Sequence, residues 1–133
     1  MGQHKVAVIQ SDHDIIAART LARDTSKLLG FGVIDQARIA TVVSELARNI
    51  FLYAGRGMVT VRTVERPGRT GIEIVCEDQG PGSVDIQLAM GDGYSTPHGM
   101  GMGLLGAQRL MDEFEIQSQE GKGTTIICRK WKF

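Results

Sequence analysis

Residues 36–54 read QARIATVVSELARNIFLYA, and their apolar side chains recur at intervals of three and four. This spacing puts them on one stripe of an α-helix and predicts a helix over 36–54 with a buried face. Asp35 is a candidate N-cap, and the glycines at 55 and 57 end the pattern. The stripe consists of Ile39, Val42, Val43, Leu46 and Ile50.

Glu45 and Asn49 lie four residues apart on this helix and therefore share one face. At about 100° per residue, they fall beside the apolar stripe, at the border between a core and a cleft. The amide oxygen of Asn49 suits Mg²⁺, which prefers hard oxygen ligands, and the Glu45 carboxylate suits a base that orients or deprotonates a hydroxyl. In isolation, an ordinary helix edge is the simpler interpretation of the pair.

The pattern on either side of this helix predicts one domain over residues 1–133. Runs of strands separated from helices are typical of an α+β fold, here a two-layer sandwich with helices on one face of a mostly antiparallel sheet. Residues 79–103 are rich in Gly, Pro, Asp and Ser and are expected to form a loop with a short helix near 86–90. The other expected elements are strand 5–10, helix 14–29, strands 58–65 and 72–78, helix 104–112, and strands 114–119 and 124–130.

Composition excludes several functional classes. The 15 basic and 15 acidic residues balance, whereas a general nucleic-acid binder needs a basic surface. Cys76 and Cys128 are far apart, which fits neither a disulfide framework nor a zinc site. The sequence shows no signal-peptide pattern and no apolar run of membrane-spanning length, so we expect a cytoplasmic protein that binds neither nucleic acid nor membrane.

A second motif, Asp78-Gln79-Gly80-Pro81-Gly82, comes directly after a predicted strand. An aspartate at a strand end can accept a hydrogen bond from an exocyclic amine such as that of adenine. The glycines let the backbone pass close beneath a flat ring. A plain turn explains the same residues equally well.

A third motif, Gly99-Met100-Gly101-Met102-Gly103-Leu104, leads into a predicted helix. Freed backbone N–H groups and a helix N-terminus together favour a polyphosphate. With Gly106 the motif also matches the dinucleotide fingerprint, but no strand precedes it and too few residues follow it for a doubly wound fold.

A fourth motif, Gly121-Lys122-Gly123-Thr124-Thr125, separates the last two predicted strands. A hairpin turn explains it fully. The alternative is that Thr124 reaches an adenine pocket, directly or through water.

In order, E-x-x-x-N, D-x-G-x-G, G-x-G-x-G-L and G-x-G-T resemble the N, G1, G2 and G3 boxes of the GHKL ATPases, which have the Bergerat fold. The resemblance covers about residues 5–131 and implies ATP and Mg²⁺ as ligands. It makes Glu45 the catalytic base or water-orienting residue, Asn49 the metal ligand, and about 83–99 the ATP lid. The nucleotide-binding residues that it implies are Asn49, Asp78, Gly80, Gly82, Gly99, Gly101, Gly103, Leu104 and Thr124.

Within this superfamily the sequence is most similar to the anti-sigma-factor-type serine/threonine kinases, and among them to the RsbT-type switch kinases of the stressosome. In these 133 residues we expect neither a second domain of the gyrase or chaperone kind nor a helical hairpin carrying a phosphoacceptor histidine. The resemblance implies phosphorylation of STAS-domain scaffold proteins, followed by activation of a PP2C-type phosphatase. The stretches that carry it are LGFGVIDQARIATVVSELARNIFLYAGRG, EDQGPG, DGYSTPHGMGMGL and RLMDEFEI.

Arg48 is the second candidate catalytic residue, and its role stays open. It lies about 60° from Glu45, on the side away from the apolar stripe. It could contact the γ-phosphate, contact a partner, or be solvated. The alternative function is a nucleotide-gated module that sequesters a partner such as a sigma factor without phosphorylating it.

Overall fold

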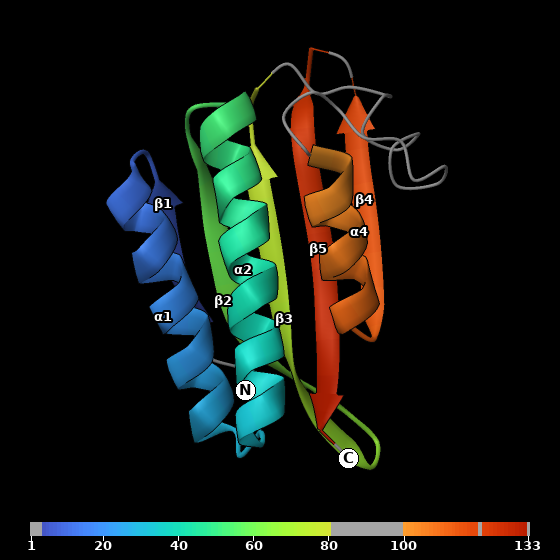
Figure 1. The fold of residues 1–133 in the computed structure, drawn as a ribbon. Helices are drawn as coiled ribbons and strands as arrows, with labels where there is room; N and C mark the ends of the chain where they lie inside the picture. The colour runs from blue at the N-terminus through green and yellow to red at the C-terminus, as the bar shows by residue number, and fades with distance from the viewer. Residues whose placement is uncertain (1–3, 81–99, 120, 133) are drawn as a thin grey trace.

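The computed structural model describes residues 4–80, 100–119 and 121–132, and Figure 1 shows their arrangement. The expected order of strands and helices is confirmed for these residues, and the short helix expected near 86–90 lies outside them. The elements are β1 (His4–Ile9), α1 (Asp12–Leu28), α2 (Val33–Tyr53), β2 (Gly57–Arg66), β3 (Arg69–Asp78), α4 (Met100–Leu110), β4 (Glu113–Gln119) and β5 (Gly123–Lys132).

The five strands form one sheet in the order β1-β2-β3-β5-β4, and every neighbouring pair is antiparallel. Helices α1, α2 and α4 all cover the same face of this sheet (Figure 1). The predicted α+β two-layer sandwich is therefore confirmed. None of the described helices is long and apolar enough to cross a lipid bilayer.

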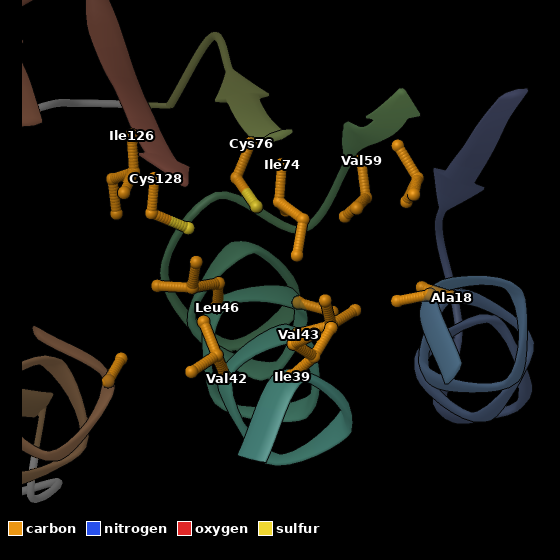
Figure 2. Close-up of a cluster of buried hydrophobic side chains, with 14 of the residues drawn as sticks. Ala18, Ile39, Val42, Val43, Leu46, Val59, Ile74, Cys76, Ile126 and Cys128 are labelled. Carbon is orange, nitrogen blue, oxygen red and sulfur yellow. The ribbon is translucent and has the colours of Figure 1, made fainter. Parts of the chain in front are cut away.

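The apolar stripe of α2 packs on the centre of the sheet, as its spacing predicts. All five of its side chains are buried. Figure 2 shows Leu46 facing the sheet beside Cys128 of β5 and Cys76 of β3. Full burial of such aliphatic side chains contributes roughly 1.5–3 kcal/mol each, so this stripe fixes α2 against the sheet.

Helix α2 begins at Val33, about one turn earlier than predicted. Gly32 rather than Asp35 is the N-cap, and the first helical bond runs from the Gln36 N–H to the Gly32 carbonyl at 2.9 Å. Asp35 lies in the first turn, where a carboxylate interacts favourably with the helix dipole. The apolar pattern misses this turn because Val33 and its neighbour Ile34 are exposed.

The sheet face opposite the helices carries a continuous ionic network. Glu73 on β3 is only 1% exposed and pairs with Arg62 on one side and Arg129 on the other. Arg129 continues to Glu113 on β4 at 3.0 Å, so opposite charges alternate across four strands. Glu113 also pairs with Arg66 at 2.8 Å.

Trp131 on β5 completes this network. Its indole N–H donates to a carboxylate oxygen of Glu113 at 2.6 Å. The guanidinium groups of Arg66 and Arg69 lie over its ring, 4.6 and 4.4 Å from the centroid. Such cation–π contacts and the ion pairs hold β2, β3, β4 and β5 together on the outer face.

Candidate functional site

Asp78 is the last residue of β3, placed between Gly57 of β2 and Thr124 of β5. One of its carboxylate oxygens accepts a hydrogen bond from the Gly80 N–H at 2.9 Å, and the Thr124 N–H donates to the same side chain. Burial raises the pKa of Asp78 above its usual range, although these two hydrogen bonds lower it in part. The half-buried carboxylate keeps lone pairs for a further donor.

Two glycines allow the backbone to close around Asp78. A Cβ at Gly80 would lie 2.6 Å from the Cβ of Ala54, at the end of α2. Gly123 has a φ of +90°, and a side chain there would collide with the carbonyl oxygen of Asp78. The glycine in the D-x-G motif thus has a packing reason, because it brings the end of β3 against the end of α2.

Thr124 faces the helix layer beside Asp78 and is nearly buried. Its hydroxyl lies 3.0 Å from the hydroxyl of Ser118, its cross-strand partner on β4. The sequence interpretation missed Ser118. Alternation along β4 would have revealed it, because opposite residues of the β4–β5 hairpin share a face.

Asn49 presents a buried polar atom that has no partner. Its side-chain nitrogen is inaccessible to solvent and forms no hydrogen bond within the described residues. An unsatisfied buried donor costs about 1–3 kcal/mol, so it calls for an explanation such as an absent ligand. A phosphate oxygen would satisfy this donor, which leaves the amide oxygen for a cation.

Glu45 lies one turn before Asn49 and is half-buried. Among the described residues it has no ion pair, so its carboxylate is available to a substrate. Nowhere in the described residues do three or more acidic, histidine or cysteine side chains gather into a metal site. That arrangement fits Mg²⁺, which usually takes one or two protein ligands, with waters and substrate phosphates as the others.

A family model described as histidine kinase-, DNA gyrase B-, and HSP90-like ATPase matches residues 34–132. The chain belongs to this family. The matched segment runs from the start of α2 to the end of β5 and contains all four motifs. The family is the one that the motifs predicted, and its members bind ATP.

The curated relatives identify the branch. The serine/threonine-protein kinase RsbT of Bacillus subtilis (strain 168) is 51% identical over 131 residues, which cover 98% of each chain. An anti-sigma F factor of Caldanaerobacter subterraneus subsp. tengcongensis is 32% identical over 86% of this chain and 82% of its own. The chain is thus an RsbT-like serine/threonine kinase of the partner-switching type, as the sequence predicted.

Solved structures confirm the fold. The RsbU and RsbW domains of Rv1364c from Mycobacterium tuberculosis match the whole chain with a TM-score of 0.63 at 17% identity. The chain spans 33% of that longer protein. The SiaB-SiaC complex from Pseudomonas aeruginosa matches 98% of this chain and 89% of its own, with a TM-score of 0.60 at 13% identity.

Helix α4, predicted over 104–112, begins four residues earlier than predicted. The helix starts at Met100, so Gly101 and Gly103 lie in its first turn rather than in a loop. Leu104 is buried in the hydrophobic core. The lid segment 83–99, with Gly82 and Gly99 at its ends, lies outside the described residues.

Arg48 does not lie in the same site as Asn49 and Asp78. It is exposed and lines a hollow between α1 and α2, together with Ser44 from its own helix. Asn49, one residue on, points about 100° away around α2. The structure therefore places this predicted catalytic arginine on the α1 side of the helix.

A separate hollow of about 430 Å³ lies behind Asp78. Three of its lining residues, Val8, Met58 and Glu77, form one cross-strand row on the outer face of the sheet. Asp78 and Ala54 also line this hollow, so it adjoins the candidate site, although Asn49 and Thr124 on the helix side are not part of its lining.

Proposed function

We propose that this RsbT-like kinase transfers the γ-phosphoryl group of ATP to a serine or threonine of a STAS-domain protein in the cytoplasm. On release from that scaffold it would bind and activate a PP2C-type phosphatase. The observation that carries the reaction is the 51% identity, over 98% of the chain, to a serine/threonine-protein kinase. The substrate class and the phosphatase follow from the same resemblance.

Asp78 would recognise the adenine. Its carboxylate would accept a hydrogen bond from the exocyclic amine, and its fixed position between Gly57 and Thr124 would set the orientation of the base. Two backbone N–H groups already hold the carboxylate, so binding requires little reorganisation of the side chain. Gly82 would lie beside the base, and Thr124 would close its other side.

Asn49 and Glu45 would act at the phosphates. Asn49 would hold Mg²⁺ through its oxygen, while its buried N–H donates to a phosphate oxygen. When bound, Mg²⁺ neutralises charge on the β- and γ-phosphates. Glu45 would orient or deprotonate the attacking hydroxyl, and the first turn of α4, with Gly101 and Gly103, would receive the phosphates under a lid formed by 83–99.

Incubation with γ-labelled ATP, Mg²⁺ and STAS-domain proteins from the same genome tests this proposal. We expect label on a serine or threonine of one candidate, and none with Glu45→Ala. Glu65→Ala is a matched control, because Glu65 is an exposed carboxylate at the far end of β2. Binding of ATP is measured in parallel and should survive in both variants.

Absence of label, in spite of ATP binding, would contradict the kinase proposal. It would favour the alternative, a nucleotide-gated module that sequesters a partner such as a sigma factor; two of the relatives carry the name anti-sigma F factor. A Glu45→Ala variant that still labels its substrate would leave the reaction intact but remove Glu45 from it.

A further inference from the structure

A groove separates α1 from α2 on the helical layer. The two helices lie side by side and antiparallel in Figure 1, and the hollow between them measures about 380 Å³. Its residues Arg48 and Leu52 point about 100° and about 60° around α2 from Asn49, on the side that faces α1. Its lining residues are Asp12, Ile15, Ile16, Arg19, Ser44, Arg48, Phe51 and Leu52.

Four of the eight residues that line the groove are large and apolar. Ile15 and Phe51 are half-buried, whereas Ile16 and Leu52 remain 53% and 56% exposed. Side chains of this size are normally covered when they gather in a hollow, so the groove has the character of a contact surface. The apolar spacing that predicted α1 and α2 does not account for Ile16 and Leu52.

Positive charge borders this apolar surface. Arg19 of α1 and Arg48 of α2 both line the groove, and neither forms an ion pair with any described residue. Asp12 is the one acidic side chain in the lining. Elsewhere in the described chain, Arg62, Arg66 and Arg129 are held by carboxylates, whereas Arg19 and Arg48, like Arg23, Arg56 and Arg109, have no ion pair; what sets the groove apart is that two such guanidinium groups border an apolar hollow.

The dimensions suit a short helix. The lining spans Asp12 to Arg19 on one helix and Ser44 to Leu52 on the other. At 1.5 Å per residue, each span is about 11–12 Å, or two helical turns. An amphipathic helix laid in such a groove presents apolar residues at intervals of three and four, and two turns supply two or three of them.

We propose that the α1–α2 groove docks an acidic amphipathic helix of a protein partner. Apolar side chains of that helix pack on Ile16 and Leu52, and its carboxylates pair with Arg19 and Arg48. This assigns Arg48 to partner binding instead of phosphoryl transfer. Because Ser44 and Arg48 flank Glu45 on α2, the occupant lies beside the kinase site without filling it.

The identity of the partner rests on the proposed function, so the test uses a STAS-domain protein and a PP2C-type phosphatase from the same genome. Ile16→Asp removes the apolar contact, and Arg19→Glu reverses one charge. Leu28→Asp and Arg23→Glu are matched controls, because they make the same changes at exposed positions of α1 outside the groove. Dissociation constants are measured for each partner and for ATP.

We expect both groove variants to bind one of the two partners at least tenfold more weakly, while the controls bind it as the wild type does. Affinity for ATP should stay unchanged in all four variants. Replacing acidic residues of the partner helix by lysine should restore its binding to Arg19→Glu. If Ile16→Asp fails to fold, as judged by circular dichroism, Arg19→Glu decides alone.

Equal binding of both partners by groove and control variants would overturn the docking proposal and leave the kinase proposal standing. Groove-dependent binding without any phosphoryl transfer would support the docking proposal and overturn the kinase proposal. A wild-type chain that binds neither partner would contradict both.

Discussion

The two polar clusters of this sheet differ in how completely their groups are paired. On the outer face, Glu73 contacts two arginines and Glu113 contacts two arginines and an indole. On the helix face, the Asn49 nitrogen is buried without a partner, and the Asp78 carboxylate retains accepting capacity.

This difference separates structure from function. A polar group whose hydrogen bonds are all made inside the protein has little to offer a ligand, and its removal affects folding. A buried group left unsatisfied lowers stability until something binds it. The cluster on the outer face should therefore govern stability, and the cluster on the helix face should govern affinity for ATP. The predictions below test this division.

The largest effect is expected for Glu73→Ala. The substitution leaves Arg62 and Arg129 without their shared carboxylate, and breaking a buried ion pair costs about 3 kcal/mol. We take the lower end of the range because Arg62 is about half exposed. Urea unfolding measures the loss, with Glu65→Ala as the exposed control. A large fall in ATP affinity of the folded variant would contradict the division of roles.

Asp78→Ala should show the opposite pattern. It removes a charge-assisted hydrogen bond to adenine worth roughly 1.5–3 kcal/mol, so affinity for ATP should fall by about 10- to 100-fold. Calorimetric titration with ATP measures this change, and circular dichroism verifies that the variant is folded. Unchanged affinity would exclude Asp78 from adenine recognition.

Gly80→Ala tests whether the D-x-G glycine is needed for packing. The new methyl group would press on Ala54, and overpacking of this kind costs about 1–3 kcal/mol. Gly106→Ala is the matched control, because Gly106 is exposed within α4 and its added methyl group meets nothing within 4 Å. That control should gain up to about 1 kcal/mol in unfolding free energy. Equal effects at both positions would refute the packing argument.

The smallest effect concerns pH. The indole N–H of Trp131, followed by Arg66 and Arg129, lowers the pKa of Glu113 from about 4.5 to about 2. A lowered pKa means that Glu113 stabilises the fold above about pH 4.5, and that this contribution is lost as the pH falls toward 2. Trp131→Phe removes the donor and should therefore cost more stability at pH 6 than at pH 2.5. Urea unfolding at both values checks this, and an equal cost would indicate a packing effect alone.

The sequence predicted the two layers and the mostly antiparallel character of the sheet, because periodicity and short connections indicate them, whereas the order of the strands comes from the structure. The stripe from Ile39 to Ile50 could only be buried by a sheet on one side of α2. The border position of Glu45 and Asn49 also follows from helical geometry, and both are half-buried as expected. The four motifs predicted the family because they occur in the right order and on the right elements: one lies within α2, and the other three lie at the ends of strands or at the start of α4.

The remaining features depend on contacts between distant residues. Glu73 looked like an ordinary alternating strand residue, and only the register of β2, β3 and β5 shows that two arginines bracket it. Arg48 was ambiguous because its surroundings depend on where α1 packs. The roles of Gly82, Gly99 and the lid stay predictions, since they lie outside the described residues.

The central claim is that ATP and Mg²⁺ occupy the under-satisfied cluster, and calorimetry of wild-type and Asn49→Ala proteins tests it most directly. Affinities for ATP are measured with Mg²⁺ and with a chelator. We predict that Mg²⁺ tightens binding to the wild type and has little effect on the variant, while the variant without ligand unfolds at the wild-type urea concentration or above it, because it has lost an unsatisfied buried donor. The same gain from Mg²⁺ in both proteins would contradict the account.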